Sequence, residues 1–158
     1  MRSIHPKHRV VTRKFPLAFA LELYLKTLLA QLDVQVPQHR DLSRLYEALP
    51  LSVREPIEAT YDTGWRSRWH GKRASLTIAK GPPDSPIWND YQSEPKDLAN
   101  LLARSRDVFQ SWRYIWEYTE PPQGLYQLHQ FEYGLLLCAC EAVRASIIRR
   151  LEDTPGPA

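Results

Sequence analysis

The chain has 158 residues, of which 43% are hydrophobic and 25% charged, with 21 Lys and Arg against 18 Asp and Glu. This length and composition predict one globular domain around a single core. The longest apolar run is far shorter than the ~20 residues of a membrane helix, and the first ten residues are polar where a signal peptide is apolar. We therefore expect a soluble cytoplasmic protein without a membrane segment. A net charge of +3 does not by itself imply nucleic-acid binding, so such a signal must come from clustered basic residues.

The residues that usually hold metals or cofactors show no typical spacing. Cys138 and Cys140 lie two apart in a predicted helix, where they point away from each other and should be buried as small hydrophobic side chains. The five histidines lack paired metal-ligand spacing, and the six glycines form no phosphate-binding loop. No serine lies in a G-x-S-x-G motif. We expect no metal and no cofactor.

The N-terminal third combines a basic segment with a helical pattern. Residues 1–14 hold five Arg and Lys residues and no acidic residue, which predicts a flexible basic arm. Apolar residues then recur at helical spacing and predict a first helix over about residues 16–33, with Val36 and Pro37 ending it. Glu22 and Lys26 lie four residues apart on that helix, an arrangement that predicts a surface ion pair worth ~0.3–0.5 kcal/mol.

Capping residues predict two further helices. Asp41 is a favourable N-cap for a short second helix, which Pro50 closes. Ser52 and Glu55 form an S-x-x-E capping box that predicts the start of a third helix, and this helix should fray near residues 63–64. Helices joined by so few residues should pack as neighbours.

The rest of the chain predicts an insertion followed by two long helices. Residues 64–93 are rich in Pro, Gly and Trp, with a short strand or hairpin indicated by alternation over 74–79. Helical spacing predicts one helix from near Ser93 to Pro121 and a last helix over about 123–151, with a disordered tail at 152–158. The seam of the last helix comprises Leu128, Phe131, Leu135, Cys138, Ala142 and Ala145. The predicted fold is all-α: a basic arm, one antiparallel bundle of four to five helices over 15–151, and a long inserted loop.

Two groups of residues are candidates for binding chemistry. The segment from Trp65 to Arg73 interleaves aromatic and basic residues without an acidic one. Such a segment can bind single-stranded nucleic acid, with arginines on phosphates and a tryptophan stacked on a base; alternatively, it is a solvated loop whose tryptophans fold back onto the bundle. The predicted nucleic-acid-binding residues are Arg66, Arg68, Trp69, Lys72 and Arg73.

The second candidate lies in the predicted fourth helix. Arg113 and Glu117 lie one helical turn apart. In one interpretation the two residues form a structural ion pair. In the other, Arg113 binds a phosphate and Glu117 orients the Arg113 side chain. His39 precedes the Asp41 cap and is expected to face solvent.

Three blocks of the sequence resemble the HEPN superfamily. Residues 18–29 read AFALELYLKTLL, residues 39–49 read HRDLSRLYEAL, and residues 112–117 read WRYIWE, in the order in which bacterial HEPN-like proteins show similar blocks. The positions that carry the first two motifs are Glu22, Lys26, His39 and Asp41. The match covers the helical parts and leaves 64–93 as an insertion.

The resemblance implies a helical bundle of four to five helices that commonly forms homodimers. Many HEPN proteins are metal-independent ribonucleases of toxin–antitoxin and phage-defence systems, and others are binding or regulatory partners. The family's active motif, an Arg followed by His after four to six residues, is absent from the predicted folded region. If the chain is a ribonuclease, we expect Arg113 to stabilise charge on the scissile phosphate, with Glu117 orienting it and His129 or His39 as acid or base.

Two functions of different classes follow from these sequence features. The first is a HEPN-like domain that binds RNA or a nucleotide, with a partner such as a nucleotidyltransferase antitoxin. The alternative is a non-catalytic helical protein that dimerises or docks a protein partner. A dimer through Phe109, Trp112 and Trp116, together with the first and last helices, would bring two copies of Arg113 together.

Overall fold

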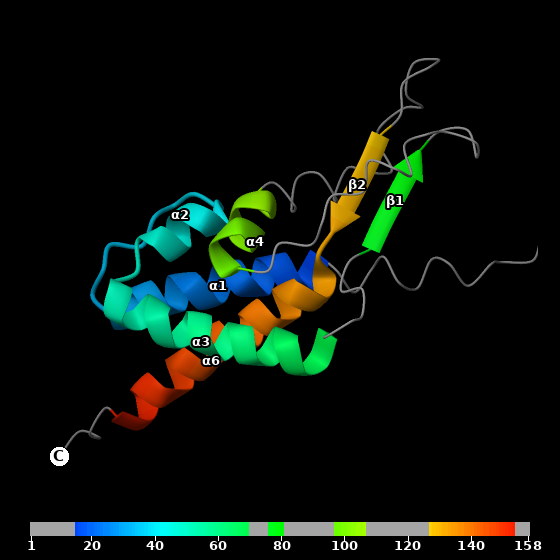
Figure 1. Ribbon diagram of the computed structural model, residues 1–158. Coiled ribbons are helices and arrows are strands. Elements are labelled where there is room, and N and C mark those ends of the chain that lie inside the picture. Colours follow the sequence, from blue (N-terminus) through cyan, green and yellow to red (C-terminus); the bar gives the residue numbers. More distant parts are fainter. Residues whose placement is uncertain (1–14, 70–75, 81–96, 107–126, 154–158) are drawn as a thin grey trace, which may run out of the picture.

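The computed structural model describes residues 15–69, 76–80, 97–106 and 127–153 (Figure 1). They form helices α1 (Phe15–Gln31), α2 (Leu42–Glu47), α3 (Leu51–Trp69), α4 (Leu98–Arg104) and α6 (Tyr133–Asp153), and strands β1 (Leu76–Lys80) and β2 (Gln127–Phe131). The described part of the chain is therefore mostly helical, which agrees with the predicted all-α class. No helix in this part is long and apolar enough to cross a membrane.

The hydrophobic core lies where α6 packs between α1 and α3, and α2 covers α1 beside α4. The predicted spacing on the first helix is confirmed, since Leu21, Leu25 and Leu28 are fully buried. The last helix contributes Leu135, Cys138 and Ala142 to the core as its seam predicts. Further core residues include Leu29, Leu45, Tyr46, Ile57, Tyr61, Leu101, Leu102, Leu136, Ala139 and Val143.

Helices α1 and α6 run in the same direction. Near their starts the Cys140 thiol donates to the Leu17 carbonyl oxygen at 3.4 Å, and near their ends Gln31 and Leu151 line one pocket. The expected antiparallel arrangement is therefore wrong for this pair, whereas α3 runs opposite to both (Figure 1). The physical reason is connectivity, because only short loops force neighbouring helices to be antiparallel and α1 and α6 are far apart in sequence.

Helix α1 ends earlier than Pro37 requires. It stops at Gln31, and Asp33 adopts a left-handed backbone with φ of 53°. The Val34 amide then donates to the Leu29 carbonyl at 3.0 Å, which satisfies a carbonyl of the last turn. Aspartate tolerates this conformation better than most residues do. The turn at Asp33, and not the proline, terminates the helix.

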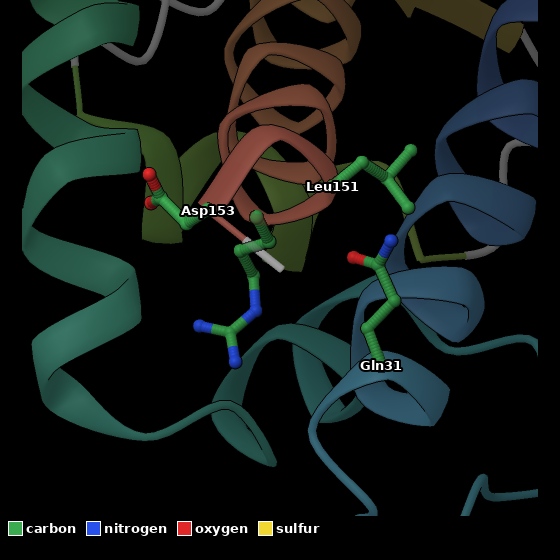
Figure 2. A pocket seen from close by; sticks show the side chains of 4 residues that line it. Gln31, Leu151 and Asp153 are labelled. Atoms are coloured by element: carbon green, nitrogen blue, oxygen red, sulfur yellow. The ribbon is translucent and has the colours of Figure 1, made fainter. Parts of the chain in front are cut away.

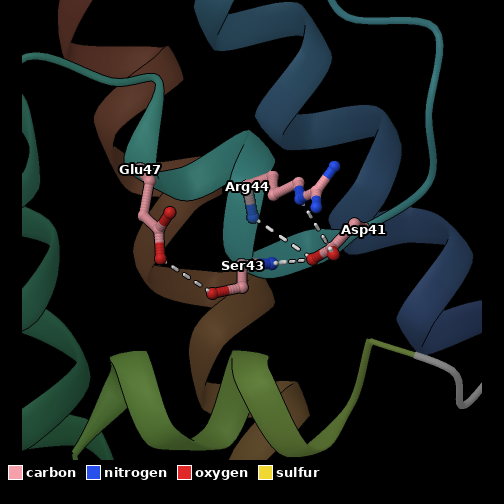
Figure 3. A network of polar contacts seen from close by, with 4 residues as sticks. All are labelled: Asp41, Ser43, Arg44 and Glu47. Carbon is pink, nitrogen blue, oxygen red and sulfur yellow. Dashed lines mark hydrogen bonds and ion pairs between the residues drawn. The ribbon is translucent and has the colours of Figure 1, made fainter.

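Asp41 is the N-cap of α2, as predicted. Its Oδ1 accepts hydrogen bonds from the Ser43 and Arg44 amides at 3.0 and 3.2 Å (Figure 3). The Arg44 guanidinium lies 3.7 Å from Asp41 Oδ2, and the Ser43 hydroxyl donates to Glu47 at 3.1 Å. Two amides that lack helical partners are therefore satisfied by one carboxylate.

We expect Asp41→Ala to lower the free energy of unfolding by about 1 kcal/mol, the usual cost of losing an N-cap oxygen. Urea denaturation followed by circular dichroism measures this change. Asp41→Asn is the matched control, because its amide oxygen can still accept both bonds and should preserve most of the stability. Equal losses in the two variants would mean that the charge, not the cap, is what matters.

The predicted capping box of the third helix is wrong. Helix α3 begins at Leu51, so Ser52 lies inside the first turn and not at the N-cap position. The Pro50 carbonyl oxygen instead accepts from the Val53 and Arg54 amides at 2.9 and 3.1 Å. The turn that leaves α2 thus leads directly into α3, and the Tyr46 hydroxyl donates to Glu58 at 2.8 Å between these neighbouring helices.

The expected fraying of α3 at Gly64 is also wrong, because the helix continues to Trp69. A Cβ atom at Gly64 would lie 3.9 Å from the Cβ and Sγ atoms of Cys138, an ordinary contact distance. The glycine therefore lies where α3 packs against α6, and tertiary packing outweighs its poor helix propensity. Residues 64–69, which were predicted to open an inserted loop, therefore belong to α3.

The C-terminal half differs from the two long helices that were predicted. Helix α4 begins at Leu98, with the Asp97 side chain as N-cap accepting from the Asn100 amide at 2.8 Å. It ends at Arg104 with Ser105 as its C-cap, so the predicted helix is interrupted there, and its residues from 107 on lie outside the described part. The helix that was expected from about residue 123 starts only at Tyr133.

Residues 127–131 form β2, which pairs antiparallel with β1 and places Ile78 opposite His129. The indicated strand at 74–79 is thus shifted to 76–80, and its partner is a distant segment where a helix was predicted, not the second arm of a local hairpin. The last helix extends to Asp153, so the predicted tail is helical over 152–153 and residues 154–158 lie outside the described part.

Candidate nucleic-acid interface

The predicted basic and aromatic segment starts on a helix, not in a loop. Trp65 and Trp69 lie one turn apart on α3 and pack against the core, whereas Arg66 and Arg68 point outward with side chains 64% and 46% exposed. Residues four apart share a helix face, so the two tryptophans lie together on the covered face, whereas Arg66 and Arg68, two residues apart, leave the helix on different sides of it. We call Arg66 and Arg68 the α3 arginine pair.

The two tryptophans are held by neighbours within the fold. The Trp65 indole donates to Asp62 Oδ1 at 3.2 Å. Trp69 meets Tyr133 edge to face, with ring centroids 5.8 Å apart and an angle of 84°. Edge-to-face packing of this kind contributes about 0.5–1.5 kcal/mol beyond burial. This placement favours the interpretation in which the tryptophans fold back onto the bundle, and it leaves the arginines as the solvent-facing part of the segment.

Each arginine of the pair is held by a carboxylate. Arg66 Nη2 lies 3.3 Å from Asp62 Oδ2, and its guanidinium lies 5.0 Å above the Trp65 ring. Arg68 Nη1 donates to both oxygens of Glu141 on α6, at 3.1 and 3.0 Å, and Glu141 raises the pKa of Arg68. Exposed ion pairs contribute only about 0–1 kcal/mol and weaken with salt. An anionic ligand can therefore displace either carboxylate at modest cost.

The remaining predicted binding residues have different placements. Lys72, Arg73, Arg113 and Glu117 lie outside the described residues. His129 belongs to β2, where its backbone pairs with Ile78. The structure thus places Arg66, Arg68 and Trp69 in the last turns of α3, the arginines exposed and the tryptophan against the core, and the proposed phosphate ligand Arg113 lies outside the described residues.

Glu22, Lys26 and Asp41, which carry the HEPN-like motifs, make contacts within and at the ends of helices in the described part of the chain. Glu22 is buried and accepts from Lys26 Nζ at 2.8 Å, so the predicted ion pair forms but is not a surface pair. Burial makes loss of the lysine alone costly, because a desolvated carboxylate would remain. Asp41 caps α2, and His39 is exposed in the turn before it, as expected.

Sequence reasoning missed a second buried carboxylate. Glu132, 4% exposed, lies directly before α6 and approaches Arg104 of α4 with 3.7 Å between Oε1 and Nη2. Its carbonyl accepts from the Leu136 amide at 2.9 Å. Like Glu141, it pairs with a residue far away in sequence, so no local spacing signals the contact. Among the described residues, no group of three His, Cys, Asp or Glu side chains is arranged to hold a metal ion.

Both cysteines are free and buried, as predicted. Burial raises the pKa of the Cys138 thiol, and it raises that of Cys140 to about 12. The reactive form of cysteine is the thiolate, so neither residue has the properties of a nucleophile.

We expect both thiols to resist iodoacetamide at pH 8 in the folded protein and to react fully in denaturant. Because folding raises both pKa values, the stability from burying neutral thiols is present below the unfolded pKa of ~8.5 and decreases as pH rises above it. Mass spectrometry of alkylated protein counts the modified residues. Rapid modification of Cys140 in the native protein would contradict the burial.

A pocket of about 320 Å³ opens where α1 and α6 end. Figure 2 shows Gln31, Leu151 and Asp153 around it, with Arg150 as the fourth lining residue. None of the residues predicted for binding lines this pocket.

Comparisons of the chain with family models, with curated proteins and with solved structures give no match. The functional assignment therefore depends on the site itself and on the sequence resemblance.

Proposed function

We propose that this protein is a HEPN-like helical-bundle domain that binds RNA or a nucleotide through the end of α3. The observation that carries this proposal is the α3 arginine pair. Arg66 and Arg68 are exposed near one helix end and paired with surface carboxylates, and the sequence continues from them to Lys72 and Arg73 without an acidic residue. Guanidinium groups with weak internal partners are suited to phosphate oxygens.

Two further features support the HEPN-like assignment. The first two motif blocks lie on α1 and on the turn and helix that Asp41 caps, and Glu22 and Lys26 are paired on α1. We propose that α1, α2, α3 and α6 belong to one bundle of the HEPN type, with an insertion between α3 and α4. Ribonuclease activity is a subordinate part of the proposal, in which Arg113 stabilises charge on the phosphate, Glu117 orients it, and His129 acts as acid or base.

The test is incubation of the purified full chain with a labelled single-stranded RNA in EDTA. Retention that weakens with salt is the expected result for a binder, because phosphate contacts release counterions. Cleavage in EDTA would add a metal-independent ribonuclease, and its loss in Arg113→Ala with unchanged binding would assign that residue. Absence of both binding and cleavage would remove the proposal.

A second candidate function has its own observation. Phe19 and Leu23 are 43% and 46% exposed and lie one turn apart on the outer face of α1, while Ile148 and Leu151 are 38% and 62% exposed on α6. Exposed apolar side chains at helical spacing favour a protein interface. This is the alternative of a non-catalytic protein that forms a homodimer or docks a partner such as a nucleotidyltransferase.

Light scattering at micromolar concentration tests the dimer. Leu135, Cys138 and Ala142 of the predicted seam are buried in the core, and Phe109, Trp112 and Trp116 lie outside the described residues, so the outer face of α1 is the described part of the predicted interface that stays exposed. A dimer that Leu23→Asp converts to monomer would support this alternative. A single-chain mass that does not change on concentration would eliminate the homodimer.

A further inference from the structure

An acidic cleft of about 500 Å³ lies between α3 and the start of α4. Its walls contain four carboxylate residues and a tyrosine together with small apolar positions. The lining residues are Glu55, Glu58, Ala59, Tyr61, Asp62, Asp97, Leu98 and Ala99. None of the residues predicted from the sequence to bind phosphate belongs to this cleft.

The described basic side chains neutralise the carboxylates of the cleft only in part. The bonds from Asn100 lower the pKa of Asp97, and Glu58 accepts only the neutral Tyr46 hydroxyl. Arg66 offsets Asp62, and Arg54 does not line the cleft. Glu55 has no partner among the described residues. Negative charge therefore predominates, which repels phosphate and attracts a cation.

The tyrosine of this cleft is an independent sign of a missing partner. Tyr61 is fully buried, yet its hydroxyl has no hydrogen-bond partner within the described residues. Burial is the largest cause that raises the pKa of Tyr61; Cys138 and Glu132 on the α6 side raise it further, and so do Asp62 and Asp97, which line the cleft. A buried hydroxyl without a partner costs about 1–3 kcal/mol, so such groups usually have a ligand or an ordered water.

We propose that this cleft holds the basic N-terminal arm of the same chain, residues 1–14. The arm carries Arg2, Lys7, Arg9, Arg13 and Lys14 and no acidic residue, so its charge complements the cleft. An ammonium or guanidinium group entering the cleft pairs with Glu55 and Glu58 and reaches the Tyr61 hydroxyl as a donor. This inference does not depend on RNA binding at the α3 arginine pair.

The N-terminal arm is long enough to reach beyond the far end of α1. Fourteen extended residues span roughly 46 Å. The 17 residues of α1, at whose start the arm is attached, are only about 26 Å long. The arm can therefore span the whole length of α1 and extend beyond it.

The test is zero-length carbodiimide cross-linking of the full chain, followed by peptide mapping. This reagent joins an amine to a carboxylate only when the two are in contact, so we expect Lys7 to couple to Glu55, Glu58 or Asp62, whereas Lys14, directly before α1, should couple to them much less. Mixing ¹⁵N-labelled and unlabelled protein separates coupling within one chain from coupling between chains. The proposal requires links within one chain, and links only between chains would overturn it in favour of a second copy.

Matched charge variants establish whether the cleft holds the arm. Ala59→Lys adds a positive charge inside the cleft without removing a contact, and it should lower the yield of these links about fivefold. Ala30→Lys, on an exposed position of α1, adds the same charge elsewhere and should leave the yield unchanged. Lysine links that go mainly to other carboxylates, or equal yields in the two variants, would overturn the proposal.

Discussion

Leu25→Ala should lower the free energy of unfolding by about 2–5 kcal/mol, the usual range for deleting a fully buried leucine side chain. Leu25 has no exposed surface and lies in the core that α1 shares with α6. The deletion removes apolar contacts and leaves a cavity that helices on both sides can close only in part. Urea unfolding followed by circular dichroism measures the loss.

Leu23→Ala is the matched control for that experiment. The residue type, the helix and the substitution are the same, but Leu23 is 46% exposed on the outer face of α1. We expect a change within about 0.5 kcal/mol, as for most surface substitutions. Similar losses in both variants would mean that the outer face is also buried, as it would be in a stable dimer, and the loss at Leu23 would then depend on protein concentration.

The double variant Arg66→Ala, Arg68→Ala should weaken binding of single-stranded RNA on the order of tenfold at 0.1 M salt. Each lost phosphate contact lowers the salt slope of the binding constant by ~0.7 for a single strand, so the slope should fall by about 1.4 for two. Fluorescence anisotropy at several salt concentrations measures both quantities. The fold should persist, because the two exposed ion pairs contribute little stability.

Two control variants distinguish RNA binding at the α3 arginine pair from a general effect of the protein's positive charge on RNA affinity. Arg149→Ala removes a positive charge from an exposed position near the end of α6 and should change the affinity much less. Glu141→Gln releases Arg68 from its carboxylate and should strengthen binding, since a phosphate no longer competes with that ion pair. If Arg149→Ala weakens binding as much as the double variant does, the α3 arginine pair is not the site.

Local sequence patterns were sufficient to predict helices with a regular apolar spacing or a recognisable capping residue. The helical spacing of leucines predicted α1 within two residues at each end, and Asp41 predicted the start of α2. The burial of Cys138 and Cys140 followed from their positions in an apolar run. These features depend on hydrogen bonds and side-chain periodicity within a few residues, which a sequence displays directly.

Long-range contacts decided the features that were predicted wrongly. Gly64 indicates a helix end by its propensity, but packing against Cys138 keeps α3 helical to Trp69. Residues 127–131 continue a helical spacing in the sequence, but pairing with β1 makes them a strand. In both places a partner from a distant part of the chain supplies more stability than the local preference removes.

The sequence by itself determined that the chain forms mainly helices, where the first two begin, and that basic residues cluster from Arg66 to Arg73. The tertiary structure decided which side of that cluster faces solvent, because it turns Trp65 and Trp69 toward the core and leaves the α3 arginine pair outside. It also joined α3 to Glu141 and formed the acidic cleft with Asp97. A one-dimensional pattern fixes helix faces, but only packing selects which face is covered and which distant charges meet.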